Sequence, residues 1–177
     1  MKGISTNSKD TLWLIGFYLD PDAERPDIYT LFRPGDEDKP LVSGGYVVFF
    51  SELALAPKAA ELCDVQITTP VSLFAEDVDL ECYVAESLYL INSQDTDSSA
   101  TIVNFLNTLF DLVKATQLPM PAEYKRVLYA FADHLTFNRE FSTFFAQQSI
   151  SRSMITNAIL WCIGAVVAKS KLLTCAE

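Results

Sequence analysis

The sequence contains one histidine, His134, and it directly follows Asp133. A histidine that a carboxylate holds in place can act as a general base near neutral pH. The surrounding residues predict a helix, however, and adjacent side chains on a helix point about 100° apart, so Asp133 is badly placed to orient the imidazole. A histidine near the end of a helix also has an ordinary role beside unpaired carbonyls. We therefore keep His134 as a candidate only and assign no catalytic residue.

Metal and thiol chemistry have little support in the residue spacing. The four cysteines are widely spread and form no C-x-x-C pair, so we expect free thiols that pack as small apolar groups: Cys63, Cys82, Cys162 and Cys175. No Cys/His cluster suits zinc. Two acidic strings, starting at Asp77 and Asp95, lack the glycine and the glutamate that a calcium loop requires. We predict no metal site.

Nucleotide and hydrolase motifs are also missing. The turn Ser43-Gly44-Gly45 is followed by an apolar run that predicts a strand, and neither G-x-G-x-x-G nor a Walker lysine is present. There is no G-x-S-x-G nucleophile elbow. The turn is better explained as a β-hairpin connection, and we predict no cofactor.

Negative charge is concentrated in the first part of the chain. The net charge is −10, and residues 1–100 carry −12 whereas residues 101–177 carry +2. The acidic side chains crowd three predicted loops, at residues 20–27, 36–38 and 76–81. Such a field repels nucleic acid and anionic membranes, and it speeds association with a basic protein. The alternative is that these charges only keep an apolar-rich chain in solution.

If the acidic loops bind a basic partner, we expect several carboxylates on one rigid face with an aromatic side chain at its centre. The residues predicted to bind such a partner are Asp22, Glu24, Asp27, Tyr29, Asp36, Glu37, Asp38 and Tyr46.

The elements that would position these residues are strands. Residues 12–19 are apolar at both alternate sets of positions, which predicts a central strand covered on two faces. Residues 28–32 predict a second strand, and residues 41–50 predict a hairpin around Gly44-Gly45. A short helix is then predicted at residues 57–63 and a short strand at residues 65–67. The pattern of residues 71–91 fits either a helix or a strand.

Beyond residue 99 the apolar spacing is helical throughout. We predict four helices, at residues 101–116, 122–135, 137–147 with Thr136 as its cap, and from Ser149 or Ser151 to about Leu173. Short connections favour antiparallel packing. Phe137, Phe141, Phe144 and Phe145 recur at helical spacing and are expected to lie in the core.

The sequence thus predicts an α+β fold, with a small N-terminal β-sheet and one or two short helices, followed by about four packed helices. Its organisation would be an acidic β-rich subdomain (1–91), a connecting loop (92–99) and a helical subdomain (100–177) within one continuous globular unit. The longest nearly apolar stretch, residues 158–168, is too short for a transmembrane helix, and no signal peptide is apparent, so we expect a soluble cytoplasmic protein.

Three functional hypotheses remain open at this point. The first is a non-enzymatic interaction protein whose acidic face binds a basic protein, for example an immunity or inhibitor protein that neutralises a basic toxin or nuclease. The second is an enzyme without a sequence signature that uses His134 and dispersed carboxylates. The third is a structural subunit that forms a homodimer or larger homo-oligomer through its helical half.

Overall fold

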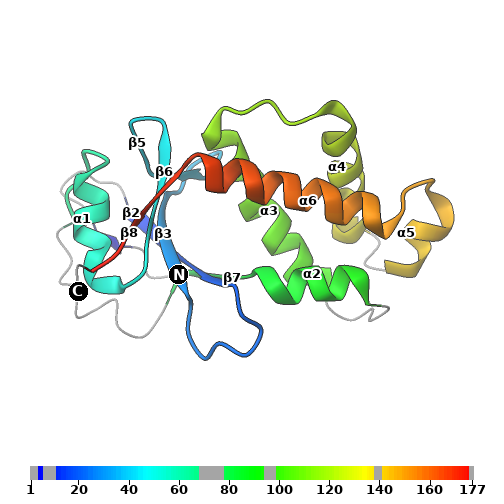
Figure 1. The fold of residues 1–177 in the computed structure, drawn as a ribbon, viewed down its shortest axis with the longest axis horizontal. Helices are drawn as coiled ribbons and strands as arrows, with labels where there is room; N and C mark the ends of the chain where they lie inside the picture. Colours follow the sequence, from blue (N-terminus) through cyan, green and yellow to red (C-terminus); the bar gives the residue numbers. More distant parts are fainter. Residues whose placement is uncertain (1–3, 6–10, 68–77, 94–98, 138–140, 176–177) are drawn as a thin grey trace.

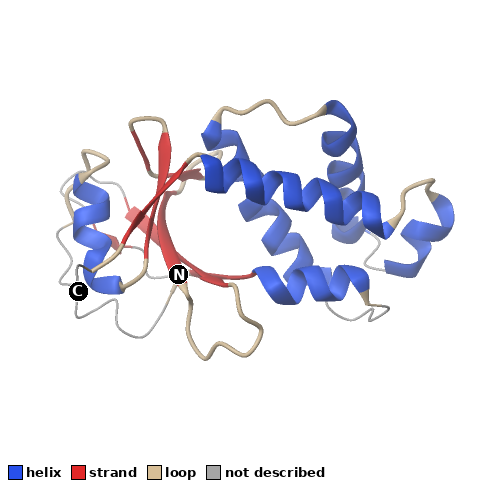
Figure 2. Ribbon diagram, in the orientation of Figure 1, coloured by secondary structure: helices blue, strands red, loops and turns tan. Residues whose placement is uncertain are grey.

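The chain has an α+β fold in the computed structural model, which describes residues 4–5, 11–67, 78–93, 99–137 and 141–175. A mixed β-sheet built mainly from the first half packs against helices from the second half (Figure 2). The predicted fold class, a small N-terminal sheet followed by about four helices, is confirmed.

The sheet is organised around strand β2 (Thr11–Tyr18), which the sequence predicts as the central strand. β2 pairs antiparallel with β3 (Ile28–Arg33), and β3 pairs antiparallel with β6 (Tyr46–Phe50). The short strand β1 (Ile4–Ser5) pairs with the start of β2. β1, β2 and β3 follow one another in the chain, so their antiparallel pairings are local, whereas residues 34–45 separate β3 from β6.

Both faces of the sheet are covered, as the apolar character of β2 requires. Ile15 and Phe17 point into a large core shared with the helices of the second half, and Leu12 and Leu14 point into a smaller core on the opposite face. The smaller core is closed by the 3₁₀ turn η1 (Leu53–Leu55) and helix α1 (Ala56–Glu61). Figure 1 shows α1 on one side of the sheet and the remaining helices on the other.

The predicted hairpin is present between β5 (Val42–Ser43) and β6. Its two turn residues, Gly44 and Gly45, have φ angles of 59° and 81°, a conformation that glycine adopts without a steric penalty. The preceding strand β4 (Lys39–Pro40) pairs with β3, so the β4–β5 segment lies between the far ends of β3 and β6. The sheet therefore splays apart at this end.

The two edge strands come from segments distant in the sequence. β7 (Leu80–Tyr83) runs parallel to β2, and β8 (Ser170–Leu173) runs parallel to β6. The prediction of a last helix reaching Leu173 is wrong, because helix α6 ends at Ala168 and the chain then pairs with β6. Residues 71–91, which fit either type by pattern, contain β7 and then a helix, and residues 71–77 lie outside the described part of the chain.

Five helices make up the other half of the described fold. They are α2 (Val84–Asn92), α3 (Ser99–Thr116), α4 (Ala122–Phe137), α5 (Phe141–Gln147) and α6 (Arg152–Ala168). The side chain of Ser151 accepts a hydrogen bond from the Met154 amide at 3.3 Å, which confirms one of the two predicted caps for the last helix.

The predicted cap at Thr136 is wrong. The Thr136 hydroxyl donates to the Ala132 carbonyl at 2.8 Å inside α4, and this helix continues through Phe137. A threonine hydroxyl can bond back to the carbonyl four residues earlier, so the residue type alone does not mark a helix start. Phe137, expected in the core, is 81% exposed, whereas Phe141 and Phe144 are buried.

Arg152, the first residue of α6, makes contacts with both α2 and α5. Its Nη1 donates to the carbonyl of Ile91 in the last turn of α2, at 2.7 Å, and to that of the C-cap residue Ser93, at 2.5 Å. The guanidinium carbon also lies 5.0 Å and 4.5 Å from the ring centroids of Phe141 and Phe145. One side chain thus satisfies carbonyls at the end of α2 and makes cation–π contacts with α5.

The large core contains residues from both sides of the predicted 92–99 connection, including Phe32 and Phe49 from the sheet and Phe105 and Ile159 from the helices. The subdomain division stays a prediction, and residues 94–98 lie outside the described part. Of the helices described, none combines the length and apolar character needed to cross a membrane.

Candidate functional site

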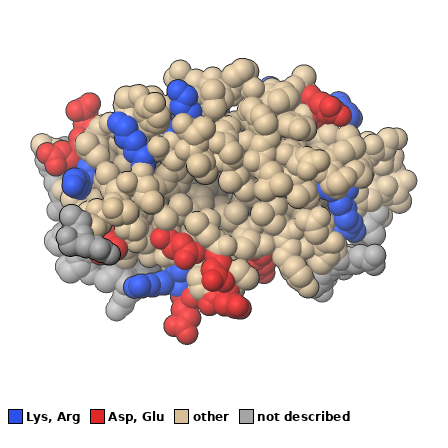
Figure 3. Space-filling model, in the orientation of Figure 1, with Lys and Arg blue, Asp and Glu red and all other residues tan. Residues whose placement is uncertain are grey.

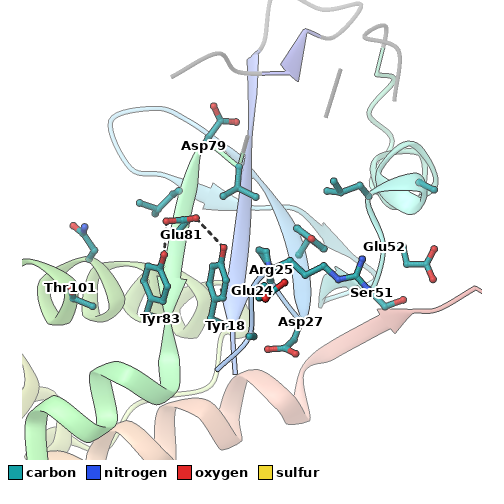
Figure 4. Close-up of a pocket in the computed structure, with 18 residues that line it drawn as sticks. Tyr18, Glu24, Arg25, Asp27, Ser51, Glu52, Asp79, Glu81, Tyr83 and Thr101 are labelled. Atoms are coloured by element: carbon teal, nitrogen blue, oxygen red, sulfur yellow. Dashed lines mark hydrogen bonds between the residues drawn. The ribbon is translucent and has the colours of Figure 1, made fainter. Parts of the chain in front are cut away.

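An open groove of about 1660 Å³ lies at the end of the sheet where β2 leads into β3. Its walls come from the β2–β3 loop, from residues 51–54 after β6, from residues 78–83 around β7, and from the first turns of α3 (Figure 4). Five carboxylates line it, those of Glu24, Asp27, Glu52, Asp79 and Glu81, together with one guanidinium, that of Arg25. We call this region the acidic groove.

Glu81 is held in place by two tyrosines on the groove wall. Its Oε1 accepts a hydrogen bond from the Tyr18 hydroxyl at 3.0 Å, and its Oε2 accepts one from the Tyr83 hydroxyl at 2.7 Å (Figure 4). The two rings stack with centroids 4.6 Å apart. A carboxylate has about four acceptor positions, so Glu81 is fixed and still able to accept further donors.

The same contacts change how the tyrosines titrate. The hydrogen bond to the Glu81 carboxylate, with burial, raises the pKa of Tyr83 to about 12. Burial, followed by the hydrogen bond to Glu81, raises the pKa of Tyr18. Both hydroxyls therefore stay protonated at neutral pH, where they act as donors that position Glu81 and do not act as bases.

The β2–β3 loop that carries Glu24 and Asp27 has its own hydrogen bonds. The Asp27 Oδ2 accepts from the Leu19 amide at 2.8 Å and from the Asp20 amide at 3.3 Å, and the Asp27 amide donates to the Phe17 carbonyl at 2.9 Å. The Asp20 Oδ1 accepts from the Asp22 amide at 2.9 Å. These contacts tie the loop to the end of β2, so its carboxylates project from a defined backbone.

Gly16 on β2 allows this loop to lie close to the sheet. A Cβ placed on Gly16 would lie 2.5 Å from Pro26 Cγ and 3.1 Å from Val78 Cγ1. No side chain fits there without moving the loop or the segment before β7. The absence of a side chain at this position thus sets the distance between the loop and the sheet.

Asp79 closes the groove at the start of β7. Its Oδ2 accepts a hydrogen bond from the Leu14 amide at 2.9 Å, and its own amide donates to the Leu14 carbonyl at 2.8 Å. Burial raises the pKa of Asp79, and the hydrogen bond from Leu14 partly offsets that rise. The residue therefore has a structural role, pairing the edge of β2, as well as a charge on the groove wall.

The carboxylates of the acidic groove form no ion pair with the Lys and Arg side chains that the structure describes. Within the described ranges the structure contains one ion pair, between Lys114 and Glu37, and it lies elsewhere. Arg25 extends across the groove toward the side formed by Ser51 and Glu52 (Figure 4). With five acidic groups against one basic group, the described lining of the groove carries a net negative charge near neutral pH.

The structure separates the residues that the sequence grouped as one partner-binding face. Glu24, Asp27 and Tyr29 line the acidic groove, and Asp22 is exposed in the same loop. Asp36, Glu37 and Asp38 lie beyond the opposite end of β3 and line a second hollow. On the face drawn in Figure 3, acidic side chains gather at the lower edge, where the β2–β3 loop lies in Figure 1.

The rings of the two aromatic residues expected at the centre of that face, Tyr29 and Tyr46, both contact other side chains of this chain. Tyr29 is only 6% exposed, and its ring stacks on Phe50 with centroids 5.8 Å apart. Tyr46 lies at the hairpin, with the ammonium groups of Lys169 and Lys171 at 5.2 and 5.4 Å from its ring centroid. In the groove, Tyr18 and Tyr83 are the aromatic residues that hydrogen-bond to a lining carboxylate, that of Glu81.

The sequence does not predict several lining residues as binding residues, among them Tyr18, Glu52, Asp79, Glu81 and Tyr83. Asp79 and Glu81 belong to the stretch 76–81, which the sequence predicts to be one of three acidic loops. The pairing of β7 with β2 brings them to the β2–β3 loop. The sequence contains no local pattern that predicts this pairing. The one available signal is that Asp79, Glu81 and Tyr83 alternate along the chain and would lie on one side of a strand.

The second hollow measures about 880 Å³, and the carboxylates that line it differ in their burial and in their charged neighbours. Asp111 of α3 is half-buried there, and burial, then the charge of Asp38, raises its pKa to about 6. Lys114, in contrast, forms the ion pair with Glu37 and lowers the pKa of that carboxyl. The rings of Phe110 and Tyr129 stack alongside, with centroids 4.8 Å apart.

The raised pKa of Asp111 makes the stability of the fold depend on pH. The folded state binds this proton more tightly than the unfolded chain, so ionised Asp111 disfavours folding above about pH 6, and that cost disappears as the pH falls below about 4. We expect Asp111→Asn to raise the free energy of unfolding by about 1 kcal/mol at pH 7.5, after allowance for solvent screening, and to have no effect at pH 4.

Urea unfolding at both pH values measures this difference. Asp133→Asn, an exposed carboxylate of α4, is the matched control for the loss of one charge, and we expect it to change stability by less than about 0.5 kcal/mol. An equal effect of Asp111→Asn at pH 7.5 and pH 4 would show that the ionised carboxyl is not the cause.

His134 lines neither the acidic groove nor the second hollow. Its Nε2 and the Thr143 hydroxyl share a hydrogen bond of 3.1 Å, and its ring lies 5.2 Å from that of Phe144. The side chain therefore packs between α4 and α5. The structure does not bring it to the carboxylates of either hollow.

The cysteines are free thiols with raised pKa values. Burial raises the pKa of Cys63 to about 11 and those of Cys82 and Cys162 to about 12, and a hydrogen bond to Glu52 raises that of Cys175. A thiol with such a pKa is a poor nucleophile at neutral pH. Across the described residues, no group of three or more His, Cys, Asp and Glu side chains is placed to hold a metal ion.

No protein-family model, curated protein or solved structure matches this chain. Its class is therefore defined by the fold alone, an α+β protein with a mixed sheet, and its function has to be argued from the groove.

Proposed function

We propose that this protein is a non-enzymatic interaction protein that binds a basic segment of a partner protein in the acidic groove. The observation that carries the proposal is the grouping of Glu24, Asp27, Glu52, Asp79 and Glu81 around one open groove, where Arg25 is the only basic residue among the described lining residues. Lysine and arginine side chains of a partner would supply the missing positive charge.

The rigidity of the groove supports this proposal. Glu81 is fixed by two tyrosines, Asp27 by the amides of Leu19 and Asp20, and Asp79 by the amide of Leu14. Carboxylates that are already positioned lose little conformational freedom on binding, which favours affinity. A small immunity or inhibitor protein, which neutralises a basic toxin or nuclease, is the concrete form of this proposal.

Charge neutralisation in the groove tests the proposal. We expect Glu24→Gln/Glu52→Gln/Glu81→Gln to weaken binding of a fluorescent ten-residue peptide of alternating lysine and serine by about tenfold or more at low salt, measured by anisotropy. Binding to the unchanged protein should weaken as salt is raised from about 20 to 300 mM, because the Debye length shortens.

The matched control is Asp36→Asn/Glu37→Gln/Asp38→Asn, which also removes three negative charges but at the opposite end of β3. We expect this variant to change the affinity less than about twofold. If the two triple variants weaken binding equally, the peptide responds to net charge alone, and the groove is not the binding site. Absence of salt-sensitive binding to the unchanged protein would also reject the proposal.

The placement of His134 outside both hollows gives the enzyme hypothesis no support. The homodimer through the helical half stays a prediction. The observation in its favour is that Leu160 and Val167 of α6 are 52% and 67% exposed.

A further inference from the structure

We propose that the outer edge of β8 binds an extended segment of a partner protein, with acidic and apolar residues in alternation, as an added strand of the sheet. No residue of β8 lines the acidic groove, and the edge of β8 would bind the opposite charge. Among the described residues, β6 is the only strand that pairs with β8.

The hydrogen-bond pattern shows which backbone groups of β8 are turned outward. The Lys169 carbonyl accepts from the Val47 amide at 2.9 Å, and the Leu173 carbonyl accepts from the Ser51 amide at 3.0 Å. The N–H and C=O of one strand residue point to the same side, and they alternate along the strand. Ser170 and Leu172 therefore direct their amides and carbonyls away from β6, toward the open edge.

The side chains of β8 differ between the two faces of the sheet. In the β6–β8 register, Leu172 stands beside Phe49 on the face covered by the large core, and Lys171 stands beside Val48 on the α1 face. Leu172 is 54% exposed, so the apolar face of the sheet continues to its rim without a cover. Figure 1 shows β8 in front of the sheet, between α6 and α1.

The α1 face of this edge is positively charged. The ammonium groups of Lys169 and Lys171 lie over the same Tyr46 ring, at 5.2 and 5.4 Å from its centroid, so both positive charges are placed at the start of β8. The net charge of the whole chain is −10, so this pair of lysines is opposite in sign to the chain as a whole. A strand whose carboxylates point to the α1 face would complement it.

These features select the occupant. The backbone of Ser170 and Leu172 requires an extended segment, exposed Leu172 favours an apolar side chain on one face, and the lysines favour carboxylates on the other. A second copy of β8 is a poor occupant, because pairing two such edges would bring four lysines together, and lysine on an edge strand is a known means of preventing self-pairing.

Amide NMR with defined peptides tests the inference. We expect a six-residue peptide of alternating glutamate and valine to shift the amide signals of Ser170 and Leu172 in a saturable way and to slow their hydrogen exchange. A lysine–valine peptide of the same length should bind at least about fivefold more weakly, because it meets Lys169 and Lys171 with like charge. Equal binding of the two peptides, or shifts centred on the β2–β3 loop, would overturn the inference.

Two further measurements separate strand addition from simple charge attraction. A glutamate–valine peptide with an N-methyl group at every residue keeps its side-chain charge and loses its backbone donors, and we expect it not to shift Ser170 or Leu172. The variant Leu172→Pro removes an outward N–H and no bond to β6, so we expect it to keep its circular dichroism spectrum and to lose the peptide response. Undiminished binding of the N-methylated peptide would overturn the inference even if the variant failed to fold.

Discussion

Replacing Phe131 with alanine is expected to lower the free energy of unfolding by about 3–5 kcal/mol. Phe131 of α4 has no exposed surface, and its ring centroid lies 5.5 Å from that of Phe141, 5.1 Å from that of Phe144 and 6.1 Å from that of Phe145. Removing the ring leaves a cavity against α5. Because α5 is short and its aromatic contacts include those to Phe131, its docking should weaken most.

Urea unfolding measured by circular dichroism gives the size of the effect. Phe137→Ala is the matched control, since it removes the same ring from the same helix at a position that is 81% exposed, and we expect a loss below about 0.5 kcal/mol. Similar losses for the two variants would mean that the helical propensity of α4, and not the aromatic cluster, determines the stability.

Replacing Gly16 with valine is expected to destabilise the protein by about 3 kcal/mol and to displace the β2–β3 loop. The added Cβ alone would lie 2.5 Å from Pro26 Cγ, and the two methyl groups of valine need more space still. Valine is otherwise well suited to a strand, so propensity opposes the expected result. Loss of stability would therefore come from the contact with the loop.

This variant also connects the fold to the acidic groove. If the loop moves, Glu24 and Asp27 move with it, and the alternating lysine–serine peptide should bind more weakly to the fraction that remains folded. Gly164→Ala is the control substitution, because a Cβ on Gly164 meets nothing within 4 Å and the residue lies inside α6. We expect it to raise stability by about 0.5–1 kcal/mol, and a Gly16→Val protein as stable as the parent would refute the contact argument.

The elements that the sequence predicts best are those specified by local patterns. Strand β2 follows from apolar residues at both alternate sets of positions, the β5–β6 hairpin from Gly44-Gly45, and the start of α6 from Ser151. In each case the residues that determine the element lie within it or next to it, so a short window of sequence contains the necessary information.

Strand β8 shows where that approach ends. The residues Ser170–Leu173 continue a strongly apolar helix, and nothing in them requires a strand. They form one because β6 offers an unpaired edge with buried Val47 and Phe50, and pairing with that edge outweighs the local preference for helix. Long-range pairing of this kind is not visible in a local pattern.

The acidic groove was predictable only in part for the same reason. Glu24 and Asp27 were assigned from the density of charge in one loop, and both line the groove. Glu52 and Glu81 reach it from other segments through the β3–β6 and β2–β7 pairings. Asp36, Glu37 and Asp38 were grouped with them by charge, but the length of β3 separates the two ends.

The pairing of β6 with β8 also affects the order in which the sheet can be completed during synthesis. Because translation proceeds from the N-terminus, β6 leaves the ribosome about 120 residues before Ser170, the partner of Val47. Until then the backbone of Val47–Phe50 has one edge without its final partner, and the sheet cannot reach its finished form. A nascent chain with such an edge is open to pairing with other chains, so the growing protein depends on its ribosome-bound environment for longer than the early strands alone would require.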